Sequence, residues 1–233
     1  MTVTRSSDEV RADFIAKMGQ DLGEVFAVLS YELTMLSWQF QELSELYGGE
    51  QRAELMNAAA PFFFWLLQRT WWDESLLGIT RLVAPKQSMG RTNLTIQQFP
   101  ELIADAQLRE RVEKRVADVV GRADFAKAWR NKRIAHRDLE HSLDRAPEPL
   151  PPAGLEDVGG VLKDIGALLN EIESHYCNST TLYEKLPITH GALSLLYVIR
   201  DGLRREEIRQ RNWKRTSTTP RIGITMLLHS NQR

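Results

Sequence analysis

The stretch that decides the fold is residues 14–47, "FIAKMGQDLGEVFAVLSYELTMLSWQFQELSELY", because its apolar residues recur every three or four positions without a break. That spacing places them on one side of an α-helix. The stripe consists of Phe14, Met18, Leu22, Val25, Leu29, Leu33, Leu36, Phe40, Leu43 and Tyr47. We expect one long amphipathic helix that ends at the Gly48-Gly49 pair, since glycine disfavours continuation of a helix.

The same spacing continues through most of the chain. We expect further helices over residues 51–83, in a short segment up to 103, from 108 to about 142 with a bend near Gly121, over 155–176 and over 190–213. Residues 84–93, "APKQSMGRTN", read as a loop. No window alternates polar and apolar residues for long enough to predict a strand. The sequence therefore predicts an all-α fold: a bundle of long antiparallel helices, with additional C-terminal helices and no sheet.

A proline-rich segment divides the chain. Residues 145–154, "RAPEPLPPAG", hold four prolines in ten residues and predict a linker or rigid turn. We expect a helical core over residues 8–144, this linker, C-terminal helices over 155–213 that pack on the same bundle, and a tail over 214–233.

Composition excludes several classes of protein. The 233 residues carry a formal net charge of −1, which argues against a protein coated with basic residues for duplex DNA. Cys177 is the only cysteine, so the chain has no internal disulfide, and a reducing cytoplasm fits best. The most hydrophobic run, "AAAPFFFWLLQ", is about half the roughly 20 residues of a membrane span. We expect no membrane association, and no metal or cofactor, because no ligand cluster has suitable spacing.

One short stretch, "FAKAWRNKRIAHRDLEHS" (residues 125–142), concentrates cations around a histidine. On a regular helix Arg130 lies roughly 120° around from His136 and ~9 Å away along the axis. A single copy of the helix would therefore present the two side chains poorly to one target. Ile134 stands apart from the apolar stripe, among cations, and is a candidate contact for self-association.

The spacing of Arg130, Asn131 and His136 resembles the R-x(4–6)-H signature of HEPN domains (higher eukaryotes and prokaryotes nucleotide-binding). Three further segments resemble the abortive-infection U-type, AbiU-like branch of that family: "LGITRLVAPK" (77–86), "NLTIQQF" (93–99) and "IAHRDLEHS" (134–142). The resemblance implies a HEPN-like bundle and a metal-independent endoribonuclease that acts as a toxin or phage-defence effector. It also implies an RNA substrate, a homodimer with two motif helices face to face, and an antitoxin protein as a further partner.

The resemblance assigns roles to the motif residues. His136 would transfer protons near neutral pH, and Arg130 would stabilise charge on the phosphoryl oxygens. Asn131 would orient His136 or the phosphate by hydrogen bonding. Asp138 stands where some HEPN domains have a tyrosine, and it is a candidate partner for Arg137 or Arg133.

Other assignments stay open between function and structure. The weaker RNA-binding candidates are Lys132, Arg133 and Arg137, which equally suit a solvated helix face. Asp73 and Arg81 either line a cleft that supports the site or serve structure, with Arg81 paired to Asp73 or Glu74 on its own helix. The basic run over residues 204–215 either follows an RNA backbone or is a solvated helix end. The alternative function is a non-catalytic HEPN-like module that binds RNA, nucleotide or a partner protein.

Overall fold

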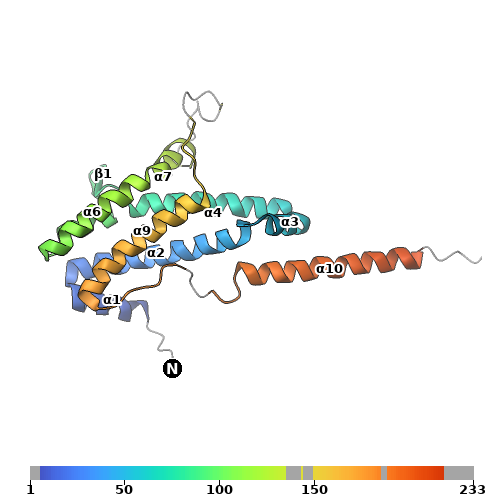
Figure 1. The fold of residues 1–233 in the computed structure, drawn as a ribbon, viewed down its shortest axis with the longest axis horizontal. Helices are drawn as coiled ribbons and strands as arrows, with labels where there is room; N and C mark the ends of the chain where they lie inside the picture. The colour runs from blue at the N-terminus through green and yellow to red at the C-terminus, as the bar shows by residue number, and fades with distance from the viewer. Residues whose placement is uncertain (1–5, 135–142, 144–148, 185–187, 218–233) are drawn as a thin grey trace, which may run out of the picture.

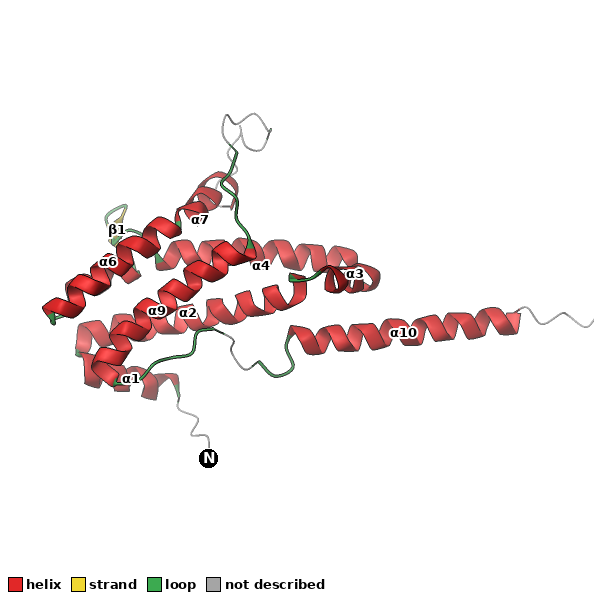
Figure 2. Cartoon of the chain, viewed as in Figure 1, coloured by secondary structure: helices red, strands yellow, loops and turns green. Residues whose placement is uncertain are grey.

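The computed structural model describes residues 6–134, 143, 149–184 and 188–217, with side chains described as far as 213. Its helices are α1 (Ser7–Met18), α2 (Gln20–Tyr47), α3 (Glu50–Ala59), α4 (Pro61–Leu82), α5 (Phe99–Leu102), α6 (Ala106–Arg122), α7 (Asp124–Trp129), α9 (Leu155–Cys177) and α10 (Ala192–Ser217). Two further turns are the 3₁₀ turn η1 (Ile96–Gln98) and the π-helical turn η2 (Arg130–Ile134). Helix dominates the described chain (Figure 2), and the predicted all-α class is confirmed.

The long helix predicted over residues 14–47 is wrong at Gly19, where the chain turns back as the hairpin of α1 and α2. Gly19 has φ 85° and ψ 166°, a conformation that glycine adopts at no steric cost. A Cβ on Gly23 would lie 2.5 Å from the Cα of Ile15, so the two helices approach too closely for any larger residue. The apolar stripe runs through the break because both helices bury that side in the same core.

The helix predicted over residues 51–83 is also two helices. Ala60, between α3 and α4, is not helical: it has φ −157° and ψ 73°. Proline disfavours a helical conformation in the residue before it, and it lacks the N–H that would continue the hydrogen-bond ladder. Pro61 therefore begins α4, at a position where the missing N–H would have no partner within the helix.

A small β-hairpin, β1 (Gln87–Ser88) and β2 (Arg91–Thr92), lies in the loop after α4. The strands are antiparallel, with Gln87 opposite Thr92. Met89 and Gly90 form the turn with φ 50° and 77°, the pair of positive angles that a two-residue hairpin favours. The expectation of no sheet is wrong here, because strands of two residues are too short to leave an alternating pattern in the sequence.

The main hydrophobic core lies between α1, α2, α4, α6 and α9 (Figure 1). Its fully buried side chains include Phe26 and Leu33 of α2, Leu76 of α4, Val112 of α6 and Ile165 of α9. Each such residue contributes about 1.5–3 kcal/mol by burial. This core fixes α4 in the bundle, and α7 and η2 pack against α4.

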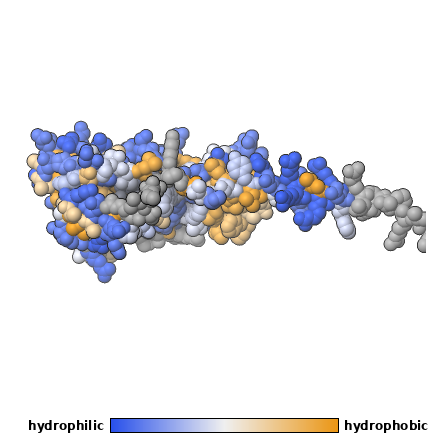
Figure 3. All heavy atoms as spheres, turned by 90° about the horizontal axis from the view of Figure 1, so that it is seen from below, coloured by the Kyte–Doolittle hydropathy of each residue, from blue (hydrophilic) through white to orange (hydrophobic). Residues whose placement is uncertain are grey.

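Helix α10 is held by a second, smaller cluster. Ala192 and Leu196 of its first turns pack with Leu46, Met56 and Phe64 from α2, α3 and α4. The rest of α10 extends away from the bundle (Figure 1), and its far end is largely hydrophilic (Figure 3). Within the described residues, every helix is too short or too polar to serve as a transmembrane span. The proposed division of the chain into core, linker, C-terminal helices and tail stays a prediction.

Candidate functional site

The motif segment is anchored at its N-terminal end. Ala126 of α7 is fully buried, and Phe125 and Trp129 pack against the main core. The indole Nε1 of Trp129 donates a hydrogen bond to the carbonyl oxygen of Pro151, at 2.9 Å. The proline-rich segment is therefore tied to the motif helix at the residue just before Arg130.

Residues Arg130–Ile134 do not continue α7 as an α-helix but form the π-helical turn η2. A π turn pairs residues five apart in place of four, so side chains on it point in other directions than on a regular helix. The separation of 120° predicted between Arg130 and His136 assumed a regular helix, which residues Arg130–Ile134 do not form; His136 itself lies outside the described residues, so the separation stays a prediction. The same turn brings Ile134 half-buried against the main core, so this isoleucine does not stand out from the surface as expected.

Arg130 is held by its neighbour in the sequence. Its Nε and Nη2 both donate to Oδ1 of Asn131, at 2.9 and 2.7 Å. Asn131 was predicted to orient His136 or a phosphate, and in the structure it orients the guanidinium of Arg130. Because a guanidinium has five N–H donors, this contact leaves it able to bind a phosphate. The predicted residues His136, Arg137 and Asp138 lie outside the described residues.

Arg133 and Asp73 lie on a common pocket beside η2. This pocket has a volume of about 480 Å³ and opens between α2, α4, η2 and the start of α9. We call it the tryptophan pocket after its three indoles; its side chains include Trp65, Trp72, Trp129, Arg69, Arg133 and Asp73. The guanidinium carbon of Arg133 stands 5.2 Å from the ring centroid of Trp129, and that of Arg69 stands 5.9 Å from the ring centroid of Trp65. Both are cation–π contacts.

The charge of Asp73 responds to its place in this pocket. Burial raises the pKa of the Asp73 carboxyl above its usual range, and the nearby charges of Arg69 and Arg133 oppose that rise. The structure therefore brings together two candidate residues, Asp73 and Arg133, that the sequence did not connect. Lys132 is half-buried on the same turn, and the tryptophan pocket does not include it among its described lining residues.

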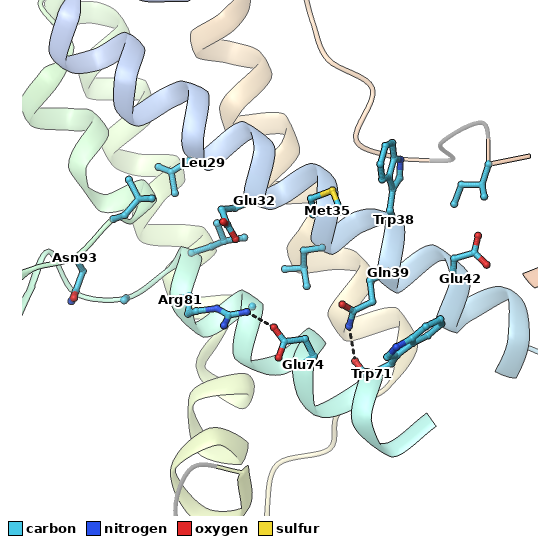
Figure 4. A pocket seen from close by; sticks show the side chains of 16 residues that line it. Leu29, Glu32, Met35, Trp38, Gln39, Glu42, Trp71, Glu74, Arg81 and Asn93 are labelled. Carbon is cyan, nitrogen blue, oxygen red and sulfur yellow. Dashed lines mark hydrogen bonds and ion pairs between the residues drawn. The ribbon is translucent and has the colours of Figure 1, made fainter. Parts of the chain in front are cut away.

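A larger groove lies on the other face of α4. It has a volume of about 1030 Å³, runs between α2 and α4, and carries Glu32, Glu42, Glu74 and Arg81 (Figure 4). Arg81 forms an ion pair with Glu74, one of the two partners predicted for it. The predicted support residue Arg81 therefore lies in this acidic groove and not beside Arg130.

Side chains of the "NLTIQQF" segment contact carbonyl oxygens at the C-terminal end of α4 and in the loop after it. Oγ1 of the buried Thr95 lies 2.8 Å from the carbonyl oxygens of both Leu82 and Ala84, and Nδ2 of Asn93 donates to the carbonyl oxygen of Pro85. The last carbonyl groups of a helix have no partner within it. These side chains supply partners at the end of α4 and in the loop after it, so "NLT" has a structural role here.

Sequence reasoning missed the tryptophan pocket. Trp65, Arg69, Trp72 and Asp73 are spaced by four, three and one positions, which places them on one face of α4. That spacing was a usable signal. Trp129 and the backbone at Gly154 come from distant segments, and only the folded chain brings them to this face.

The remaining charged clusters among the described residues serve other ends. Arg209 pairs with Glu206 at 3.3 Å and Arg211 with Glu207 at 3.8 Å, within the far end of α10. These pairs suit the solvated helix end predicted as one reading of the basic run. In the described part of the chain, no three side chains of His, Cys, Asp or Glu gather as metal ligands would.

Comparison with known proteins identifies one family. A sequence model of the HEPN family AbiU2 matches residues 19–189, a range that includes the motif and the three resembling segments. No curated protein and no solved structure matches the chain. The family match covers well over half of the 233 residues. The chain therefore belongs to the AbiU2 family of HEPN domains.

Proposed function

We propose that this HEPN domain is a metal-independent endoribonuclease of the cytoplasm, acting as a toxin or as an effector of abortive infection against phage. The observation that carries the proposal is the guanidinium of Arg130, which Asn131 holds on the π-helical turn six residues before His136. Fixed donors stabilise developing charge without reorganising during the reaction. π-Helical turns also occur frequently at functional sites.

The proposed reaction uses the RNA as its own nucleophile. The 2′-hydroxyl attacks the adjacent phosphorus, the bond to the 5′-oxygen of the next nucleotide breaks, and a 2′,3′-cyclic phosphate and a 5′-hydroxyl result. One proton leaves the 2′-oxygen and one joins the 5′-oxygen. His136 would carry one of these transfers, because the pKa of histidine suits proton exchange near neutral pH. Arg130 would bind the phosphoryl oxygens, and neither role needs a metal ion.

The proposal is tested with purified protein and mixed cellular RNA, with and without EDTA. Cleavage should persist in chelator and leave 2′,3′-cyclic phosphate ends, and His136→Ala should abolish it with the fold intact by circular dichroism. Cleavage that stops in EDTA and returns with magnesium would contradict this mechanism.

The second candidate function is a module that binds RNA, nucleotide or a partner protein without cleaving. The tryptophan pocket favours it, since a pocket lined by indoles and arginines can hold a nucleotide with no chemistry. A wild-type protein that binds RNA and leaves it uncut in both conditions would support this alternative over the nuclease.

We further propose a homodimer as the working unit, with the two motif segments face to face so that each site draws on both chains. Light scattering at micromolar concentration should then report about twice the 26.7 kDa chain mass. Mixing inactive His136→Ala with inactive Arg130→Ala chains should restore some cleavage. An active, stable monomer would contradict the shared site. An antitoxin protein is the further partner that the toxin role implies.

A further inference from the structure

The walls of the tryptophan pocket suit a flat aromatic ligand. Two of its indoles have an arginine over their rings, Arg69 over Trp65 and Arg133 over Trp129, and Trp72 is the third indole of the lining. Unpaired nucleobases stack on indole rings and on guanidinium planes alike. The two arginines also supply positive charge for the phosphates that any nucleotide brings.

The volume of the pocket limits the ligand to a small unit. About 480 Å³ lies within the range of 300–1,000 Å³ typical of small-molecule sites. One nucleotide fits such a space and an RNA duplex does not. The ligand is therefore a base turned out of its strand, as is usual when proteins read single-stranded RNA.

Asp73 is the one carboxylate among the described residues that line the pocket. The cations Arg69 and Arg133 act on it as nearby charges, and no side chain or backbone group among the described residues forms a hydrogen bond with its carboxylate. A half-buried carboxylate without a hydrogen-bonding partner has both oxygens available to accept from a ligand. Partial burial strengthens such bonds, because water competes less for the oxygens.

The chemistry of a carboxylate selects among the four bases. Guanine presents two adjacent N–H donors, on N1 and N2, which match the two oxygens of one carboxylate. Adenine and cytosine offer an exocyclic amine beside an acceptor, and the acceptor would face a negative oxygen. Uracil offers a single N–H between two acceptors. A carboxylate at the end of a base pocket therefore favours guanine.

The pocket also lies next to the proposed cleavage site. The turn η2 supplies Arg133 to the pocket and also carries Arg130, three residues earlier, which we propose binds the phosphate. A nucleotide whose base enters the pocket thus has its backbone beside η2. We infer that the tryptophan pocket binds one unpaired guanine of the RNA substrate, and that Asp73 reads its Watson–Crick edge; the inference rests on the proposed function for RNA as the ligand.

Binding of mononucleotides tests the pocket without any cleavage. Guanosine, inosine, adenosine, cytidine and uridine 5′-monophosphates are titrated against the full chain, and the tryptophan fluorescence is recorded. Guanosine monophosphate should quench the fluorescence and bind about tenfold more tightly than inosine monophosphate, which lacks only the N2 amine, since a hydrogen bond to a charged group carries that much discrimination. Equal binding of these two ligands overturns the inference, and this comparison needs no variant.

A matched pair of variants tests Asp73. Asp73→Asn should weaken guanosine monophosphate about tenfold, whereas Glu74→Gln removes the same charge one residue along α4, on the face of the acidic groove, and should change binding by less than about twofold. Thermal melting checks that both variants fold. Equal loss in both variants, or none in Asp73→Asn, overturns the assignment of Asp73.

Cleavage of RNA separates this inference from the proposed function. Short single-stranded RNAs with one guanosine, or with inosine in its place, are compared as substrates. Cleavage beside guanosine that falls about tenfold with inosine supports both. Cleavage that ignores the replacement keeps the nuclease and overturns the guanine pocket. Selective binding of guanosine monophosphate by a protein that cuts no RNA supports the pocket and overturns the nuclease, leaving a free nucleotide as the source of the base.

Discussion

The acidic groove and the tryptophan pocket lie on opposite faces of helix α4 and differ in charge, size and neighbours. The groove is the larger and presents Glu32, Glu42 and Glu74 against a single Arg81, whereas the pocket presents Arg69 and Arg133 against a single carboxylate. A phosphate backbone is repelled by the first and attracted by the second.

Residues of two segments that resemble the AbiU-like branch and the described residues of the R-x(4–6)-H motif lie on different faces of α4. Arg81, Asn93 and Thr95 belong to the segments that resemble the AbiU-like branch, and they pair or hydrogen-bond within the groove side and the loop after α4. Arg130 and Asn131 lie near the other face, where α7 and η2 pack on α4. A family signature in this chain therefore combines residues that shape α4 with residues proposed for chemistry.

The largest effect is expected when one arginine is removed from each side of α4 and the rates of RNA cleavage are compared. Arg130→Ala should lower the rate of RNA cleavage by about 10²–10³-fold, the usual cost of losing one fixed donor to the reacting group. Arg81→Ala should change the rate by less than about threefold, because its partner Glu74 is on the acidic groove. Initial rates on a labelled RNA measure both. Equal losses would mean that the groove takes part in cleavage.

Helix α4 separates the acidic groove from the tryptophan pocket, and its buried side chain Leu76 tests how firmly it is packed. Leu76→Ala should lower the free energy of unfolding by about 2–5 kcal/mol, through lost burial and the cavity left behind. Leu66→Ala on the same helix, at a side chain that is 48% exposed, should change it by less than about 0.5 kcal/mol. Urea denaturation compares the two. Similar losses would show that the first half of α4 is covered in solution.

The C-terminal end of α4 is expected to depend on the hydroxyl of Thr95 for its stability. Thr95→Val keeps the shape of the side chain and removes the hydroxyl that contacts the carbonyl oxygens of Leu82 and Ala84. The free energy of unfolding should fall by about 1–3 kcal/mol, because the buried carbonyl oxygen of Leu82 loses the hydroxyl, whereas that of Ala84 keeps the amide of Gln97. The exposed Thr92→Val is the control and should be nearly neutral in the same denaturation experiment. A neutral Thr95→Val would refute the structural role given to "NLT".

The smallest effect expected is a pH-dependent gain in stability for Asp73→Asn. Because burial raises the pKa of Asp73 in the folded chain, against the opposing charges of Arg69 and Arg133, its ionisation disfavours folding. The folded wild type is stabilised by the protonated carboxyl of Asp73 at low pH. It loses that contribution to the free energy of unfolding as the pH rises from the unfolded pKa, about 3.9, through the raised folded value. Asp73→Asn should therefore melt slightly higher than the wild type at pH 7, and the gap should narrow as the pH falls through that window. A variant that melts lower at pH 7 would show that the two arginines outweigh burial.

Periodicity predicted most of the helices, and with good limits where a helix buries one continuous stripe. The helix predicted over residues 155–176 is α9, Leu155–Cys177, and the last one predicted over 190–213 is α10. The breaks at Gly19 and Ala60 were missed because the apolar stripe continues on both sides of each break. Their causes are local: a glycine with positive φ and a proline that starts the next helix.

The sequence predicted those parts of the candidate site whose residues are close together in the chain. Arg130 and Asn131 are neighbours, and their contact lies within one turn of the motif. The π-helical geometry of that turn was not predictable, because the composition of residues 130–134 suits an α-helix equally well. The tryptophan pocket needs segments more than a hundred positions apart in the chain, from Leu43 to Leu155, and no spacing rule connects them.

The projecting helix α10 has a consequence for how the mass of this protein in solution is judged. Twenty-six residues of α-helix measure roughly 39 Å, and only the first turns bury side chains in the second cluster. A body with such an arm experiences more friction with water than a sphere of equal mass. A single chain will therefore leave a gel-filtration column earlier and sediment more slowly than a compact protein of equal mass, and its elution volume alone will overstate its mass.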